Sequence, residues 1–279
     1  CEYSNMMEYI RRNMVDEVFV HLSSQTNLPI NKIIKELEVM GVTVDLNINV
    51  FEMEIPVQRE IERIGNYYTV SFSPKIHSFK QIFFKRVMDI VGAIVGLLIT
   101  GIVTVFLAPA LLIESPGPLF FSQVRVGKNG RRFKIYKFRS MYMDAEERKK
   151  ELMSQNEMEG LMFKMENDPR VTKVGKFIRK TSIDELPQFW NILKGEMSLV
   201  GTRPPTEDEF LQYEGYHRRR LNMTPGLTGL WQVSGRSDTK NFEEIVAMDV
   251  EYIDNWSLKE NIKILFKTVG VVLKGKGAS

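Results

Sequence analysis

The sequence predicts an α/β accessory fragment followed by a mainly α (α+β) domain. That domain is expected to contain a re-entrant membrane helix and amphipathic helices at the membrane interface. Two observations support this prediction. An uncharged run at 90–113 interrupts a chain in which 26% of residues are charged, and strand and helix patterns alternate only before that run. We therefore divide the chain into an accessory region at 1–73, a linker at 74–84, and a second domain at 85–279 with its membrane helix at about 85–115.

The accessory region contains one strand–helix–strand unit. Residues 16–22 read as a short apolar strand, 31–40 have helical spacing ended by Gly41, and 43–50 alternate as a strand does. This unit is half of a Rossmann-like domain, but the glycine-rich turn that brings a backbone close to a pyrophosphate is missing. A packing or regulatory role is therefore favoured over cofactor binding. We expect the region to support homo-oligomers.

The uncharged run is long enough to cross a membrane. Its 24 residues would extend ~36 Å as a helix, against a hydrocarbon core of ~30 Å. Both flanks are basic and lack acidic residues, at 66–87 and 115–143, and basic flanks favour the cytoplasmic side. Because Pro109 removes a backbone hydrogen bond, we infer a helix that bends near Ala108 and Pro109 and returns to the same face. An ordinary span and a buried core helix are the alternatives.

The C-terminal segment predicts an amphipathic helix. Ser257 and Glu260 match a capping box at its start. Apolar residues then recur on one helical face, and most lysines lie off that face. Such a helix either lies in the membrane interface or packs on the core of the protein, and the pattern does not decide between them. The apolar positions are Leu258, Ile262, Leu265, Phe266, Val269, Val272 and Leu273.

Residues 119–140 predict a basic β-hairpin. The pair Asn129–Gly130 favours a tight turn, and both arms alternate. Arg125 lies on the first arm and Lys137 on the second. Such a surface commonly faces solvent or lipid headgroups, and the more specific interpretation is a phosphate pocket.

The segment 168–193 carries the strongest chemical signal. Asp184 and Glu185 follow Arg179 and precede an apolar helix. An acidic pair at a helix start is often only a cap, and Ser182 with Glu185 matches the capping-box spacing. However, Pro187 would then fall inside the helix, whereas a start at or near Asp184 places it in the first turn. Neither carboxylate is therefore committed to capping, and both suit phosphate chemistry or a metal ion.

Two later loops each present one arginine. Residues 198–205 contain Arg203, and residues 224–236 contain Arg236, both among glycines and prolines. Arginine binds phosphate with two N–H donors, so these two and Arg179 form a candidate phosphate site beside the acidic pair.

These stretches together resemble the monotopic phosphoglycosyl transferases, also called bacterial sugar transferases. The resemblance runs from Lys85 to about Lys274, and its motifs occur in the family's order. The matching residues are Lys85-Arg86-x-x-Asp89, Ala108-Pro109, Gln123-x-Arg125-x-Gly127, Lys137 to Met141, Arg179 with Asp184 to Gln188, Gly201-x-Arg203-Pro204, and Pro225-Gly226 with Thr228-Gly229 continuing to Arg236.

The resemblance implies a function. Asp184 would attack the β-phosphate of a UDP-sugar, UMP would leave, and polyprenyl phosphate would take up the phosphosugar. Glu185 would help to coordinate Mg²⁺. The enzyme would act on the cytoplasmic face of the bacterial inner membrane, among membrane lipids, in exopolysaccharide or capsule synthesis. The residues expected to bind the substrate are Arg125, Lys137, Arg179, Arg203, Gln232 and Arg236.

Bulk properties leave rival functions open. The net charge of +3 gives no indication of nucleic-acid binding, and the single Cys1 cannot form an internal disulfide, which fits a reducing compartment. A membrane-anchored binding or scaffold protein would use the acidic pair only as a cap. A phosphohydrolase of sugar nucleotides would release sugar phosphate without a lipid acceptor. The sequence does not name the hexose, although the resemblance favours glucose or galactose.

Overall fold

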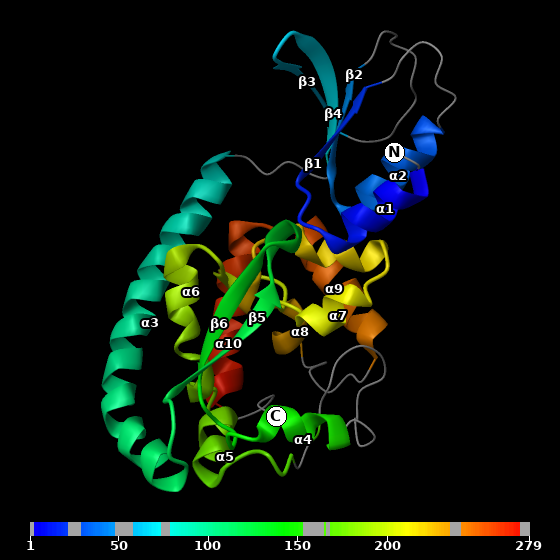
Figure 1. Cartoon of the computed structure of the whole chain (residues 1–279). Coiled ribbons are helices and arrows are strands. Elements are labelled where there is room, and N and C mark those ends of the chain that lie inside the picture. The colour runs from blue at the N-terminus through cyan, green and yellow to red at the C-terminus, as the bar shows by residue number, and fades with distance from the viewer. Residues whose placement is uncertain are drawn as a thin grey trace.

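The computed structural model describes residues 3–21, 29–47, 58–73, 79–152, 165, 168–234 and 241–273 (Figure 1). The strands are β1 (Glu17–His21), β2 (Thr43–Asn47), β3 (Gln58–Ile64), β4 (Tyr67–Ser73), β5 (Phe120–Val126), β6 (Arg132–Phe138), β7 (Ser198–Val200) and β8 (Gly226–Thr228). The α-helices are α1 (Tyr3–Arg12), α2 (Ile30–Met40), α3 (Phe79–Glu114), α4 (Ala145–Leu152), α5 (Lys173–Lys180), α6 (Gln188–Lys194), α7 (Glu207–Leu211), α8 (Leu230–Val233), α9 (Phe242–Asp254) and α10 (Leu258–Leu273). Three 3₁₀ turns are η1 (Lys128–Gly130), η3 (Ile183–Glu185) and η4 (Tyr216–Leu221).

The N-terminal region forms a four-stranded sheet in the order β1-β2-β4-β3. The strand–helix–strand unit predicted from the sequence is present, with β1 parallel to β2 and α2 between them in sequence. Helix α2 ends at Gly41, which has a left-handed φ of 72°. The antiparallel hairpin β3–β4 was not predicted. Strand β3 lies at the edge of the sheet and has only two apolar residues, Ile61 and Ile64, three positions apart, so its sequence gives only a weak strand signal.

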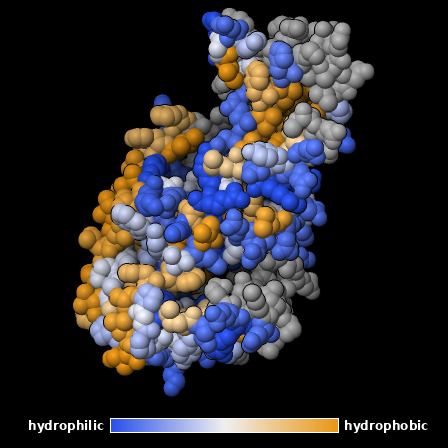
Figure 2. Space-filling model, in the orientation of Figure 1, coloured by the Kyte–Doolittle hydropathy of each residue, from blue (hydrophilic) through white to orange (hydrophobic). Residues whose placement is uncertain are grey.

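Helix α3 is a single helix of 36 residues. It begins within the stretch expected to be a linker and contains Pro109. It runs along one edge of the molecule (Figure 1), where apolar side chains gather on the surface (Figure 2). Its mean hydropathy is 2.7 over the most apolar window, of which only 22% is buried. By length and composition the helix can lie in a membrane, and its many exposed apolar side chains fit a lipid environment better than a buried core position.

The core of the second domain lies between α3, the β5–β6 hairpin and α10. Its centre consists of fully buried side chains such as Ala93 on α3, Ile192 on α6, Val200 on β7 and Ile264 on α10. Asn191 on α6 joins this core to the hairpin. Its amide donates to the carbonyl of Lys134 at 2.7 Å and accepts from the N–H of Tyr136 at 3.2 Å. This pairing holds β6 against the start of α6, where the acidic pair lies.

The apolar helix after the acidic pair begins later than the sequence indicates. Helix α6 starts at Gln188, with Pro187 at its N-cap, so neither Ser182 nor Asp184 caps it. Asp184 and Glu185 lie in the separate turn η3, and Ser182 makes no side-chain cap bond there. The capping-box alternative is therefore excluded, whereas the helix start expected at or near Asp184 is wrong, because α6 starts at Gln188. A proline before the first helical residue satisfies the geometry better, since its missing N–H would be unpaired in any case.

The C-terminal helix packs on the core of the protein with only part of its apolar face. Leu258 and Leu265 pack against the core. In contrast, Ile262, Phe266 and Val269 are exposed. The N–H of Glu260 donates to Ser257 Oγ at 3.2 Å, which is one half of the expected capping box. The apolar face of α10 is thus wider than the core requires, and the excess faces outward.

Candidate active site

The acidic pair lies at a tight change of chain direction. Helix α5 ends at Lys180, and Ser182 adopts a left-handed φ of 56°, which is uncommon for a residue with a side chain. This reversal directs the turn η3 back against the hairpin strand β6. Because η3 is followed at once by Pro187 and α6, Asp184 and Glu185 are held between two helices. Asp184 is only 7% exposed.

Lys137 connects the hairpin to the acidic pair. Its Nζ lies 2.6 Å from Oε1 of Glu185, and both side chains are about one-third exposed, at 29% and 33%. The lysine is 48 positions away in the sequence, so only the tertiary fold brings the two together. The basic hairpin therefore reaches the acidic pair through Lys137, and its role as a phosphate pocket stays a prediction.

The two carboxylates have opposite electrostatic environments. Burial raises the pKa of Asp184 to about 6, opposed by the positive charge of Lys137 and reinforced by the negative charge of Glu185. Burial also acts to raise the pKa of Glu185, but the ammonium of Lys137 outweighs it, so this pKa is lowered. Glu185 is thus ionised and paired with the ammonium of Lys137, whereas Asp184 is a buried carboxylate whose negative charge is poorly stabilised. This divergence is typical of functional carboxylate pairs.

Arg179 lies on the last turn of α5 beside the pair. Its Nε donates to Ser140 Oγ at 3.0 Å. Its charge acts on Asp184 as well, where it lowers the pKa. The guanidinium is therefore held from one side by Ser140 and lies within electrostatic reach of the acidic pair, as a phosphate-binding group should.

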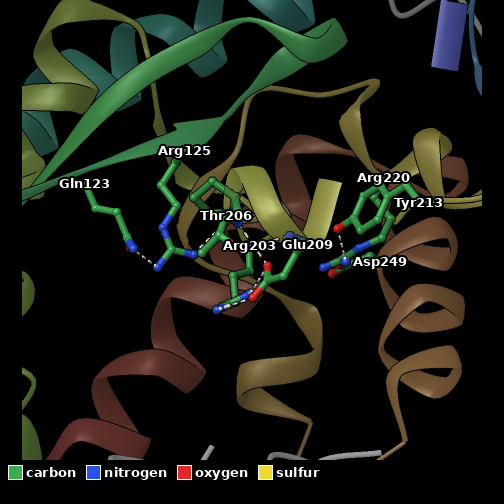
Figure 3. Close-up of polar contacts among 9 residues, drawn as sticks. Gln123, Arg125, Arg203, Thr206, Glu209, Tyr213, Arg220 and Asp249 are labelled. Carbon is green, nitrogen blue, oxygen red and sulfur yellow. Dashed lines mark hydrogen bonds and ion pairs between the residues drawn. The ribbon is translucent and has the colours of Figure 1, made fainter. Parts of the chain in front are cut away.

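Arg203 lies in the loop before α7, and Arg125 projects from strand β5 toward that loop (Figure 3). Nη1 of Arg203 pairs with Oε2 of Glu209 at 3.1 Å, and the same carboxylate completes a capping box with Thr206. Arg125 donates to the carbonyl of Pro204 at 3.2 Å. The charge of Arg203 also contributes to the lowered pKa of Glu185, so its guanidinium acts electrostatically on the acidic pair.

Of the other two predicted substrate-binding residues, only Gln232 is described by the structure. Arg236 lies outside the described residues. Gln232 lies on α8, and within the described part of the chain its buried Oε1 has no hydrogen-bond partner. Ala108 and Pro109 lie inside α3, where the neighbouring Leu107 and Leu111 pack with Ile183 and Leu186 beside the acidic pair.

Sequence reasoning missed two residues that support the arginines. Glu209 was detectable, because Thr206 and Glu209 have capping-box spacing. Ser140 gave no chemical signal of its own, since a lone serine on a strand end rarely marks a site. Its importance comes from the position of Arg179 in space.

The donor set suits a hard divalent cation that a substrate helps to bind. Among the described residues no group of three or more His, Cys, Asp or Glu side chains could hold a metal ion alone. Asp184 and Glu185 supply two carboxylates, and Mg²⁺ typically binds one or two of these together with substrate phosphates. The residues present therefore fit Mg²⁺ bound jointly with a diphosphate.

Comparison with known proteins gives the family. The family model described as bacterial sugar transferase matches residues 80–275. The chain belongs to the bacterial sugar transferase family. The matched region contains α3, the hairpin, the acidic pair and all the arginines discussed above. The resemblance inferred from the motifs is thus confirmed.

Several curated proteins resemble this sugar transferase. It is 51% identical over 266 residues to the galactosyl transferase CpsE of Streptococcus agalactiae serotype III, covering 95% of this chain and 59% of that protein. It is 46% identical over 200 residues to the undecaprenyl-phosphate galactose phosphotransferase of Salmonella typhimurium, covering 70% of this chain and 42% of that protein. It is 41% identical over 198 residues to the exopolysaccharide production protein ExoY of Rhizobium meliloti, covering 70% of this chain and 87% of that protein. The chain thus spans about half the length of the first two relatives.

Proposed function

We propose that this sugar transferase moves a hexose-1-phosphate from a UDP-hexose to polyprenyl (undecaprenyl) phosphate, releasing UMP. The observation that carries the proposal is the buried Asp184, with a pKa raised to about 6, beside a lysine-neutralised Glu185 and a serine-held Arg179. A helix cap would need none of these partners. One relative is named as an undecaprenyl-phosphate galactose phosphotransferase, which supports the assignment of the same substrates to this chain. Galactose is therefore the first hexose to test.

The first step is attack by a carboxylate oxygen of Asp184 on the β-phosphorus of the UDP-hexose. The bond between that phosphorus and the oxygen bridging to the α-phosphate breaks, and UMP leaves with the electron pair. A pKa of about 6 leaves Asp184 ionised near neutral pH, while its weak stabilisation keeps it reactive. Arg179 and Arg203 would hold the phosphate oxygens from two sides.

The second step regenerates the carboxylate. A terminal oxygen of polyprenyl phosphate attacks the phosphorus of the aspartyl-phosphohexose, and the bond to Asp184 breaks. The product is a polyprenyl diphosphohexose. Mg²⁺, held by Glu185 together with the substrate phosphates, would offset the negative charge that the diphosphate brings to the site. Lys137 keeps Glu185 ionised for that purpose.

We also propose that α3 is re-entrant and keeps the enzyme on the cytoplasmic face of the inner membrane. A straight helix of 36 residues would extend ~54 Å, well beyond the ~30 Å hydrocarbon core. Both of its ends contact the same domain. Near the start, Nζ of Lys85 donates to Ser198 Oγ at 2.5 Å, and Leu199 donates to Asp89 at 2.9 Å. At the end, Glu114 accepts from the backbone of α5.

This topology has a direct test at Pro109. Pro109→Ala restores the missing backbone hydrogen bond and should favour a straight helix. A straight span would pull one end of α3 from its contacts. We expect the variant to lose activity and to become labelled from both sides of the membrane, whereas unchanged topology would argue that the proline does not set the bend.

The function is tested by UMP release from UDP-hexoses by protein in lipid vesicles, with and without polyprenyl phosphate. The proposal expects a stoichiometric burst of UMP without acceptor and continuous release with it. No release from any UDP-hexose would favour a scaffold protein. Release of free sugar phosphate without a lipid product would indicate a phosphohydrolase.

A further inference from the structure

The last residue of α3 caps a helix of the catalytic domain. Glu114 Oε1 accepts from the N–H of Lys173 at 2.6 Å, and Oε2 accepts from the N–H of Val174 at 2.8 Å. The next N–H, of Gly175, donates to the hydroxyl of Thr172 at 2.8 Å. Helix α5 therefore has its first amides satisfied by two residues, and Glu114 reaches them from 59 positions away in the sequence.

The same short helix is held tightly along its length. A Cβ added at Gly175 would lie 2.0 Å from the carbonyl oxygen of Ser140, so only glycine lets α5 lie on that backbone. The N–H of Thr172 donates to the same carbonyl at 3.1 Å. The hydroxyl of Ser140 holds Arg179 at the far end of α5. A shift at the start of this eight-residue helix should therefore also move Arg179.

The helix leads directly into the acidic pair. Three residues separate its last residue, Lys180, from Asp184, and the N–H of Ser182 donates back to the carbonyl of Arg179 at 2.9 Å. The position of the nucleophile thus depends on the position of α5. Glu114, the last residue of the apolar helix α3, contacts the start of α5 and so connects α3 to the position of Asp184.

We propose that Glu114 is a positioning residue that ties the membrane helix to the placement of Arg179 and Asp184. The proposal rests on the proposed function for its kinetic readout. Its chemical basis is that a carboxylate offers two acceptor oxygens to two N–H donors. A glutamine offers one acceptor and turns an NH₂ group toward the other donor. Glu114→Gln should therefore shift α5 even though the two side chains have nearly the same shape.

The kinetic test uses the full chain in lipid vesicles and a double-mutant cycle. Glu114→Gln should lower kcat for UMP release by roughly tenfold or more, the scale of a lost charge-assisted hydrogen bond. If Glu114 acts through Arg179, Glu114→Gln should lower kcat by a much smaller factor in an Arg179→Lys background. In an Arg203→Lys background the full factor should remain, because Arg203 is held by a different loop. Glu251→Gln, on the exposed face of α9, is the matched control.

A second readout does not depend on turnover. Amide hydrogen exchange should speed up in Glu114→Gln from residue 173 through the turn at 183–185, with α9 unchanged. The positioning role would be overturned if Glu114→Gln kept the wild-type kcat, or if it lowered kcat by the same factor with Arg179 present and with Arg179→Lys. Faster exchange confined to residues 173–175 would also overturn it. If wild-type protein releases no UMP, the proposed function fails, while the exchange pattern still decides whether Glu114 positions the acidic pair.

Discussion

Replacing Asp184, the proposed nucleophile, should make the protein more stable and inactive at the same time. The surroundings of Asp184 raise its pKa from 3.8 to about 6, a rise of about 2 units, so the folded state disfavours its charge. At about 1.36 kcal/mol per unit, the ionised carboxylate costs up to about 3 kcal/mol of folding free energy. Asp184→Asn removes that charge and keeps the shape. A capping role predicts the opposite, a loss of about 1 kcal/mol.

The sign of the effect depends on pH in a defined window. Below pH 3.8 the carboxyl is neutral in both the folded and unfolded states, so the wild type pays no penalty. As the pH rises from 3.8 to about 6, the carboxyl ionises in the unfolded state before it ionises in the folded state, so the folded state becomes less stable. Above about pH 6 this loss of folding free energy is complete. The gain in stability from Asp184→Asn should therefore be full at pH 7.5 and nearly absent at pH 4.

The assay is denaturant unfolding in detergent micelles at those two pH values, with UMP release measured in parallel. We expect a higher unfolding midpoint for Asp184→Asn at pH 7.5 and less than ~1% of wild-type turnover. Glu185→Gln is the control of opposite sign, because the pKa of Glu185 is lowered and its charge contributes stability at neutral pH. A destabilised Asp184→Asn, or a gain that is the same at both pH values, would refute the reasoning.

Three further predictions follow from the site and the topology. Lys137→Met removes the positive charge that lowers the pKa of Asp184, so the acid limb of kcat/KM should move to higher pH; an unmoved limb would mean that Lys137 does not act on the catalytic ionisation. Glu185→Gln should lose most activity and require more Mg²⁺, whereas near-normal kinetics with unchanged Mg²⁺ dependence would make Glu185 a structural residue only. Cysteines at Lys80 and Lys128, in a Cys1→Ser background, should both be labelled only from the cytoplasmic side, and labelling on opposite sides would mean an ordinary span.

The acidic pair and its suitability for phosphate chemistry were found from the sequence, but the difference between the pKa values of its two carboxylates was not. Local spacing around Pro187 was enough to separate Asp184 and Glu185 from a capping box, because a proline constrains the backbone wherever it occurs. The same spacing misplaced the start of α6, since a 3₁₀ turn and a helix share the same residue preferences. The unequal pKa values needed the approach of Lys137 and the burial of Asp184, which are contacts between distant segments.

The sequence by itself determined the features that depend on neighbouring residues. The long apolar run determines helix α3, and the Asn129–Gly130 pair determines the turn of the hairpin. The absence of charged residues at 90–113 makes that part of α3 suitable for a lipid environment. Tertiary structure alone decided which of the many basic residues serve the site. It placed Lys137 on Glu185 and brought Glu114 to the start of α5, because ion pairs and caps between distant segments leave no periodic trace in a sequence.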